Sequence, residues 1–207
     1  MLRFCAAAIA LLTMATSLNG ADAQERRRTT PISPLALVLA PPPPNTAPLT
    51  VTSPDFENFG PLERVFMQPD AGGENRAPGL AWSEGPAGTQ SYVMISEGVG
   101  EHRPDPTVHW IVYDIPADAH ALPQGIPTDP IIANPAGAMN GLEATGTPGY
   151  RGTDTPEGAI HPYYFQVFAL DTKLGLDPAQ ADRNTVIDAM KGHVLAAGQI
   201  VVVHNNR

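Results

Sequence analysis

The chain has 207 residues, among them 23 prolines and 19 glycines, and its 12 basic and 21 acidic side chains give a net charge of −9. About one residue in nine is proline, which excludes long uninterrupted helices as the main architecture. Few basic side chains are present to contact phosphates, so we expect no nucleic-acid partner. The length favours one or two domains.

Residues 1–23 have the pattern of a secretory signal peptide. Arg3 precedes an apolar and small-residue run from Phe4 to Leu18, and Ala21-Asp22-Ala23 forms a small-x-small cleavage site. The run is shorter than the roughly 20 apolar residues that span a bilayer, which argues against the alternative of an uncleaved anchor. We therefore expect cleavage near Ala23, export to the periplasm or the medium, and no membrane span in the mature chain.

Cleavage at this position would also remove Cys5, the single cysteine of the chain. The mature protein would then form no disulfide, although an oxidising compartment permits them. Cysteine nucleophiles and thiolate metal ligands would be excluded as well.

Residues 24–48 differ in composition from the rest of the chain. They hold seven prolines, four of them consecutive at positions 41–44, together with a run of three arginines at 26–28. Such a segment favours extended polyproline II structure and buries little surface. It is predicted to be a stiff spacer or disordered arm, and the alternative is a docking motif for an aromatic-lined groove.

Residues 49–207 are predicted to form one folded domain. They carry 8 basic and 19 acidic side chains, a net charge of −11. A domain of this size can bury a single cohesive core. Its negative charge argues against binding to an anionic membrane surface.

The elements of this domain are mainly strands. Leu80–Trp82 and Ser91–Ile95 flank a turn-rich break and are candidates for a hairpin. Three further β-branched and aromatic runs predict central strands, at Val108–Ile115, Tyr163–Leu170 and Ile200–Val203. The domain is therefore expected to be mainly β with peripheral helices.

One α-helix is predicted near the C-terminus. Asn184 is the expected cap, and apolar residues recur at helical spacing from Val186 to Leu195, with Gly192 as a weak point. Asp177-Pro178 has the pattern of a short helical start.

The common catalytic motifs are absent: the chain has no nucleophile elbow, no HExxH, no phosphate-binding GxxxxGK[ST] and no GxGxxG. Two of its six histidines, His109 and His161, stand at expected strand ends near the glycine-rich turn Gly149–Gly152. Ring and backbone N–H groups in such a place can bind a small anion, although each histidine alone is also compatible with a structural role. The other four are interpreted as structural: His102, His120, His193 and His204.

An ordered set of segments resembles the phosphatidylethanolamine-binding proteins, in their bacterial Raf-kinase-inhibitor-like branch. The resemblance rests on Pro78–Trp82, Gly85–Tyr92, Val108–Pro116, Leu122–Gly125, Gly149–Gly152, Pro156–Gly158, His161–Phe165, Phe168–Asp171 and Gly192–Ala196. It implies two antiparallel sheets packed as a sandwich with a short C-terminal helix. It also implies a non-enzymatic protein without a cofactor or metal.

The resemblance further implies a small anion pocket at one end of the sandwich. Carried over to this chain, its residues are His109, Gly152, His161 and Tyr163, with Tyr150 and Arg151 beside the glycine loop. Ring N–H, phenol and loop N–H groups would then donate charge-assisted hydrogen bonds to a phosphate-like or carboxylate ligand.

The chain departs from the family at this pocket. The family has an Asp-Pro-Asp-x-Pro segment after the strand that is expected to end near Ile95, whereas this chain reads Ser96–His102 there. Glu101 and Asp105 are carboxylates nearby, but neither is in register. Without these carboxylates a plain anion is a better candidate ligand than an ethanolamine head group, and Asp154 adds negative charge to the loop.

Three functions therefore remain open. The first is a secreted, non-enzymatic protein that binds a small anion or inhibits a partner protein. The second is a scaffold module with a degenerate pocket. The third is a metal or hydrolase site built on His109, His161 and a carboxylate from Glu101 or Asp105.

Overall fold

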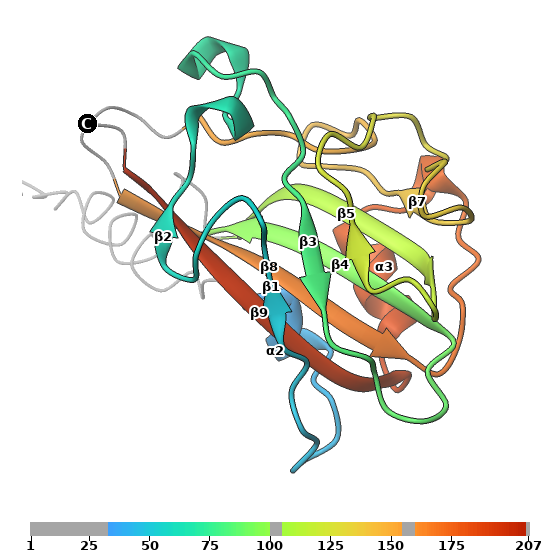
Figure 1. Cartoon of the computed structure of the whole chain (residues 1–207). Helices are drawn as coiled ribbons and strands as arrows, with labels where there is room; N and C mark the ends of the chain where they lie inside the picture. The colour runs from blue at the N-terminus through green and yellow to red at the C-terminus, as the bar shows by residue number, and fades with distance from the viewer. Residues whose placement is uncertain (1–32, 100–104, 155–159, 206–207) are drawn as a thin grey trace, which may run out of the picture. The chain divides into compact units, whose positions relative to one another are not determined.

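The computed structural model describes residues 33–99, 105–154 and 160–205, which form two β-sheets and a layer of short helices (Figure 1). The smaller sheet has the strand order β1-β3-β6 and the larger one β2-β9-β8-β4-β5-β7. Neighbouring strands are antiparallel, except that β2 runs parallel to β9. The predicted fold of two sheets with few helices is confirmed.

The larger sheet supplies most of the regular structure. Its strands are β2 (Gly60–Pro61), β4 (Ser91–Gly98), β5 (Thr107–Pro116), β7 (Met139–Asn140), β8 (Ile160–Leu170) and β9 (Val194–Asn205). The smaller sheet consists of β1 (Val51–Thr52), β3 (Leu80–Trp82) and β6 (Ala121–Leu122). The helical segments are α2 (Ala36–Leu39), α3 (Arg183–Met190), η1 (Arg64–Phe66), η2 (Pro69–Ala71) and η3 (Pro178–Gln180). None of the helices in the described ranges is long and apolar enough to cross a membrane.

Two hydrophobic cores lie on the two faces of the larger sheet. The inner core fills the space between the sheets and includes Trp82 from β3 and Phe165 from β8. The outer core lies on the opposite face, where Ile95 of β4 and Phe168 of β8 cluster with residues of α2 and α3. These two faces are called the inner and outer face below. All eight residues of β4 are buried, as expected for a central strand covered on both faces.

Two local predictions are wrong. β3 and β4 do not form a hairpin, because β3 pairs with β1 and β6 whereas β4 pairs with β5 and β8. The turn between them carries the chain from one sheet to the other.

The helix is also shorter than predicted. Asp182, not Asn184, caps α3 by accepting a hydrogen bond from the Thr185 N–H, and the helix ends at Met190. Gly192 then adopts φ +82°, and Val194 begins the last strand. The short turn at Pro178–Gln180 is confirmed, with Asp177 as its cap.

The predicted stiff spacer or disordered arm is wrong for residues 33–40, which pack on the domain. Ala36 and Ala40 are buried in the outer core, and α2 forms between them. The proline-rich composition indicates that the segment buries little surface by itself, but tertiary contacts with the sheet order it. Residues 1–32, including the predicted signal peptide, lie outside the described residues.

Candidate functional site

A β-bulge in β5 places His109 on the inner face. Ser96 pairs with Trp110 and Glu97 with Val108, so His109 is the extra residue of β5. Val108 belongs to the outer core and Trp110 to the inner core, which shows that the bulge resets the alternation of the strand. The His109 ring packs edge-on against Tyr163 of β8, with ring centroids 4.9 Å apart. Both residues are almost fully buried.

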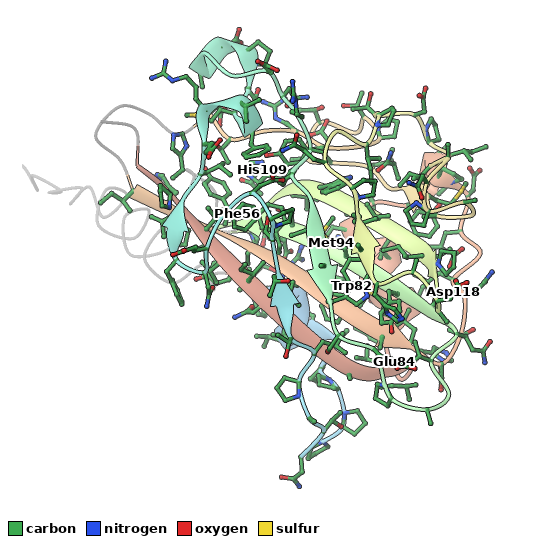
Figure 2. All side chains as sticks on the ribbon, viewed as in Figure 1. Phe56, Trp82, Glu84, Met94, His109 and Asp118 are labelled. Atoms are coloured by element: carbon green, nitrogen blue, oxygen red, sulfur yellow. The ribbon has the colours of Figure 1, made fainter. Side chains whose placement is uncertain are left out.

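His161 lies two residues from Tyr163 on the same face of β8, because side chains alternate along a strand. Its Nδ1 donates to the Val99 carbonyl oxygen at 3.4 Å, and the residue is partly exposed. The structure therefore brings three of the predicted residues, His109, His161 and Tyr163, to one end of the inner face. Figure 2 shows His109 toward the opposite end of the molecule from Glu84 and Asp118.

Two polar residues that were not predicted join this end of the sheet. His204 is 2% exposed, pairs directly with His161 across β8 and β9, and contacts Thr153 Oγ1 through Nδ1 at 2.9 Å. Ser96 lies between Trp110 and Phe165 on the inner face, and its buried hydroxyl has no hydrogen-bond partner among the described residues. In the sequence, Ser96 is marked only by its position directly after the predicted strand Ser91–Ile95. No sequence pattern indicated that His204 would join the site.

Gly152 lies in a closely packed part of its loop, beside residues 66–68. Its N–H donates to Asn75 Oδ1 at 2.7 Å, and its carbonyl accepts from Gln68 Nε2 at 2.9 Å. A Cβ at this position would lie 2.7 Å from the Met67 carbonyl carbon and 2.8 Å from the Gln68 nitrogen. The glycine thus permits the loop to approach residues 66–68 closely, and its N–H is not available to a ligand in this arrangement.

Tyr150 is also committed to the packing of this loop. Its hydroxyl donates to the Phe66 carbonyl at 2.8 Å, and burial raises the pKa of this phenol far above its ordinary value. It therefore anchors the loop to η1 as a neutral donor.

Arg151 supports His109 through its backbone. Its N–H donates to the His109 carbonyl at 2.8 Å, and its own carbonyl accepts from His109 Nδ1 at 2.9 Å. Its guanidinium lies 3.8 Å from the Asp154 carboxylate and is 35% exposed, so this pair is weak. Tyr150 and Arg151 line a hollow of about 360 Å³ that includes none of the histidines.

The nearby carboxylates do not complete the site. Glu97 is fully buried and faces the outer core, and Asp105 lines a hollow of about 470 Å³ with Val108 and Arg183. Glu101 and His102 lie outside the described residues. Within the described ranges, no group of three His, Cys, Asp or Glu side chains is placed to hold a metal ion.

Comparison with known proteins identifies the family of this two-sheet domain. The family model described as phosphatidylethanolamine-binding protein matches residues 52–205. The chain belongs to the phosphatidylethanolamine-binding protein family. This family is generally non-enzymatic.

Relatives agree with this assignment. The chain is 35% identical over 147 residues to a UPF0098 protein of Methanothermobacter thermautotrophicus, covering 69% of this chain and 91% of that protein. The crystal structure of Escherichia coli YbcL, described as a new member of the mammalian PEBP family, superposes with a TM-score of 0.72 at 27% identity, covering 78% of this chain and 100% of the other. A homologue from Chlamydia trachomatis, CT736, gives a TM-score of 0.66 at 26% identity, covering 78% of this chain and all of that one.

Proposed function

We propose that this protein binds a small anion, phosphate-like or carboxylate, at His109, His161 and Tyr163, without transforming it. The observation that carries the proposal is the convergence of two imidazoles and a phenol at one end of the inner face. The resemblance of the chain to its family nominated the same three residues. His161 is the partly exposed member and is the expected point of entry for a ligand.

The histidines, rather than the glycine loop, are the proposed donors. The N–H groups of Arg151 and Gly152 are already donated within the protein. The Nδ1 atoms of His109 and His161 face carbonyl oxygens, and a carbonyl only accepts, so Nδ1 carries the hydrogen in both rings. In a neutral ring Nε2 is then an acceptor, and a second proton converts it into a donor.

Donors at the site must overcome the negative field of the domain, because residues 49–207 carry a net charge of −11. Glu97 faces away from the site, so it does not provide an acceptor for a ligand ammonium group. A plain anion is the ligand class that this arrangement favours.

We further propose that the protein acts after export. The support is the sequence of residues 1–23, with its apolar run and small-x-small cleavage pattern. Expression of the full chain, cell fractionation and N-terminal sequencing test this proposal. The expected product is an exported chain that begins at Gln24, and an intact N-terminus in the cytoplasmic fraction would contradict it.

The ligand proposal is tested by titration with inorganic phosphate and with phosphoethanolamine. NMR signals of the His109 and His161 rings should shift with ligand concentration and reach saturation. His161→Gln should weaken binding at least about tenfold, through loss of a charge-assisted hydrogen bond.

His193→Gln is the matched control for this titration. His193 is exposed, and its Nδ1 lies 2.8 Å from the Asp171 carboxylate. His161 lies near the start of β8, whereas His193 and Asp171 lie next to the end of that strand. Loss of the His193 ring should therefore leave anion binding unchanged. If neither anion perturbs His109 or His161 at millimolar concentration, the anion proposal is wrong and the scaffold alternative gains support.

A further inference from the structure

A second polar cluster lies on the outer face of the larger sheet. Glu97 of β4, Gln166 of β8 and Arg183 of α3 meet there, and the first two are fully buried. Glu97 Oε1 accepts from Arg183 Nε at 2.5 Å, and Glu97 Oε2 accepts from Gln166 Nε2 at 2.6 Å. The three side chains are called the outer clamp below. A buried ion pair of this kind requires further hydrogen bonds to offset the cost of desolvation.

The outer clamp finds those hydrogen bonds in the main chain of residues 33–40. The Ala36 N–H donates to Glu97 Oε2 at 2.8 Å, the Leu37 N–H donates to Gln166 Oε1 at 2.8 Å, and Arg183 Nη2 donates to the Pro34 carbonyl at 2.7 Å. All three contacts are made to backbone atoms. The clamp therefore recognises this segment through its backbone, as many peptide-binding sites recognise their ligands.

Side-chain size adds selectivity to this backbone recognition. Ala36 is 0% exposed and Ala40 is 3% exposed, both in the outer core, where a larger side chain would not fit without displacement. Val38 points away from the core and is 64% exposed. The site thus accepts one turn of helix with small residues four positions apart.

The connection that ties this segment to the domain is weakly held. Residues 41–48 are largely exposed, and their one backbone hydrogen bond among the described residues is internal, from Thr46 N–H to the Pro43 carbonyl. Asn45 adopts φ +66° in this loop, whereas the four prolines before it favour a straight, extended chain. Figure 1 shows the loop, in blue at the bottom of the view, projecting away from the sheets.

We propose that the outer clamp also binds residues 33–40 of a second copy of this chain, giving a dimer by reciprocal exchange of the segment. Exchange restores every contact made within one chain, because the clamp and the segment are unchanged. Opening the loop removes the left-handed turn at Asn45 and lets the proline run extend. The balance between monomer and dimer is then set by the loop and by protein concentration.

A matched pair of loop variants of the full chain tests this proposal. Asn45→Pro forbids positive φ and opposes the turn, whereas Asn45→Gly favours it. Asn45 is exposed, so neither change touches the core. Light scattering after size exclusion should show the dimer dissociation constant of Asn45→Pro lowered at least about tenfold relative to Asn45→Gly. A monomeric Asn45→Pro at high protein concentration would overturn the proposal.

A complementation experiment tests the same contact independently. Ala36→Asp disables the segment and leaves the clamp, and the double variant Glu97→Gln with Arg183→Met disables the clamp and leaves the segment. Mixing the two, each with its own affinity tag, should yield a one-to-one complex. Replacing Ala36→Asp with Val38→Asp, whose exposed position leaves its own segment docked, should give much less complex, because that segment competes for the clamp.

Hydrogen exchange makes the complementation decisive. The amides at positions 36 and 37 should be unprotected in each disabled variant alone. In the complex they should become protected in the chain that carries Glu97→Gln and Arg183→Met, and stay unprotected in the chain that carries Ala36→Asp. Unprotected amides without a complex would show that the clamp does not bind the segment of another copy. Amides that stay protected in Ala36→Asp would show that the segment does not detach. Either result would overturn the proposal.

Discussion

The two faces of the larger sheet carry polar groups at the same end, and these groups are satisfied in different ways. On the outer face, Glu97, Gln166 and Arg183 are saturated by one another and by the chain's own residues 33–40. On the inner face, His109 and His161 are oriented by carbonyl oxygens through one ring nitrogen each, and the Ser96 hydroxyl is buried without a partner among the described residues.

This difference indicates that the outer clamp suits a peptide segment, whereas the inner site suits a small ligand. The outer clamp directs hydrogen bonds to three main-chain groups, at positions 34, 36 and 37, an array that a small anion does not offer. The inner face gathers two imidazole rings and a phenol, whose single polar atoms suit a small ligand. β4 contributes to both, since Ser96 and Glu97 are adjacent and face opposite sides.

The largest effect is expected when the outer clamp is broken on one side. Arg183→Met leaves the fully buried Glu97 carboxylate without its cation and should cost about 3–5 kcal/mol of unfolding free energy. The double variant Glu97→Gln with Arg183→Met removes both charges and should cost less than about 2 kcal/mol. Denaturant unfolding of both variants measures the difference. Equal losses would show that the ion pair does not hold this face together.

A smaller effect is expected at the loop that supports the inner site. Gly152→Ala places a Cβ against the backbone of residues 66–68 and should cost about 3 kcal/mol. Because Arg151 is bonded to His109 through both its N–H and its carbonyl, the His109 ring signal should shift in the same variant.

Gly146→Ala is the control for this loop variant. A Cβ there meets no atom within 4 Å, and only the positive φ of +83° opposes it, so the cost should be about 1 kcal/mol. An unchanged His109 signal in Gly152→Ala would mean that the loop does not position the histidine.

Much of the fold could be predicted from the sequence because its central strands are continuous β-branched and aromatic runs. Val108–Ile115, Tyr163–Leu170 and Ile200–Val203 all lie within strands of the larger sheet. The order of the family motifs also nominated His109, His161 and Tyr163, which converge. Local composition and motif order suffice for these features, since neither depends on the pairing of distant residues.

The features that were not predicted depend on such pairing. His204 joins the site only because β8 and β9 pair in the register that sets it opposite His161. The loop N–H of Gly152 is consumed by Asn75, which lies 77 residues earlier in the chain. Residues 33–40 dock on the sheet through hydrogen bonds from the Ala36 N–H to Glu97 and from the Leu37 N–H to Gln166, which lie 61 and 129 residues away in the chain. No local pattern reveals a hydrogen bond of this range.

The smallest effect is expected at Glu143, which lines the hollow beside Arg183 and also the hollow beside Tyr150 and Arg151. Burial acts to raise the pKa of this carboxyl, but hydrogen bonds from the Thr145 and Thr147 hydroxyls and the Thr145 N–H outweigh it, and the pKa is lowered from 4.5. The charged form therefore stabilises the fold above the ordinary pKa, and this stabilisation is lost as the pH falls through the lowered value.

Glu143→Gln should accordingly cost about 1 kcal/mol near neutral pH, and its unfolding free energy should approach that of the unmodified protein as the solution is acidified. Glu74→Gln is the control, because Glu74 is exposed and paired only with Arg76 among the described residues, so it should show no such convergence. Unfolding curves at several pH values measure both. A difference in unfolding free energy between Glu143→Gln and the unmodified protein that persists in acid would show that Glu143 contributes through packing rather than through its charge.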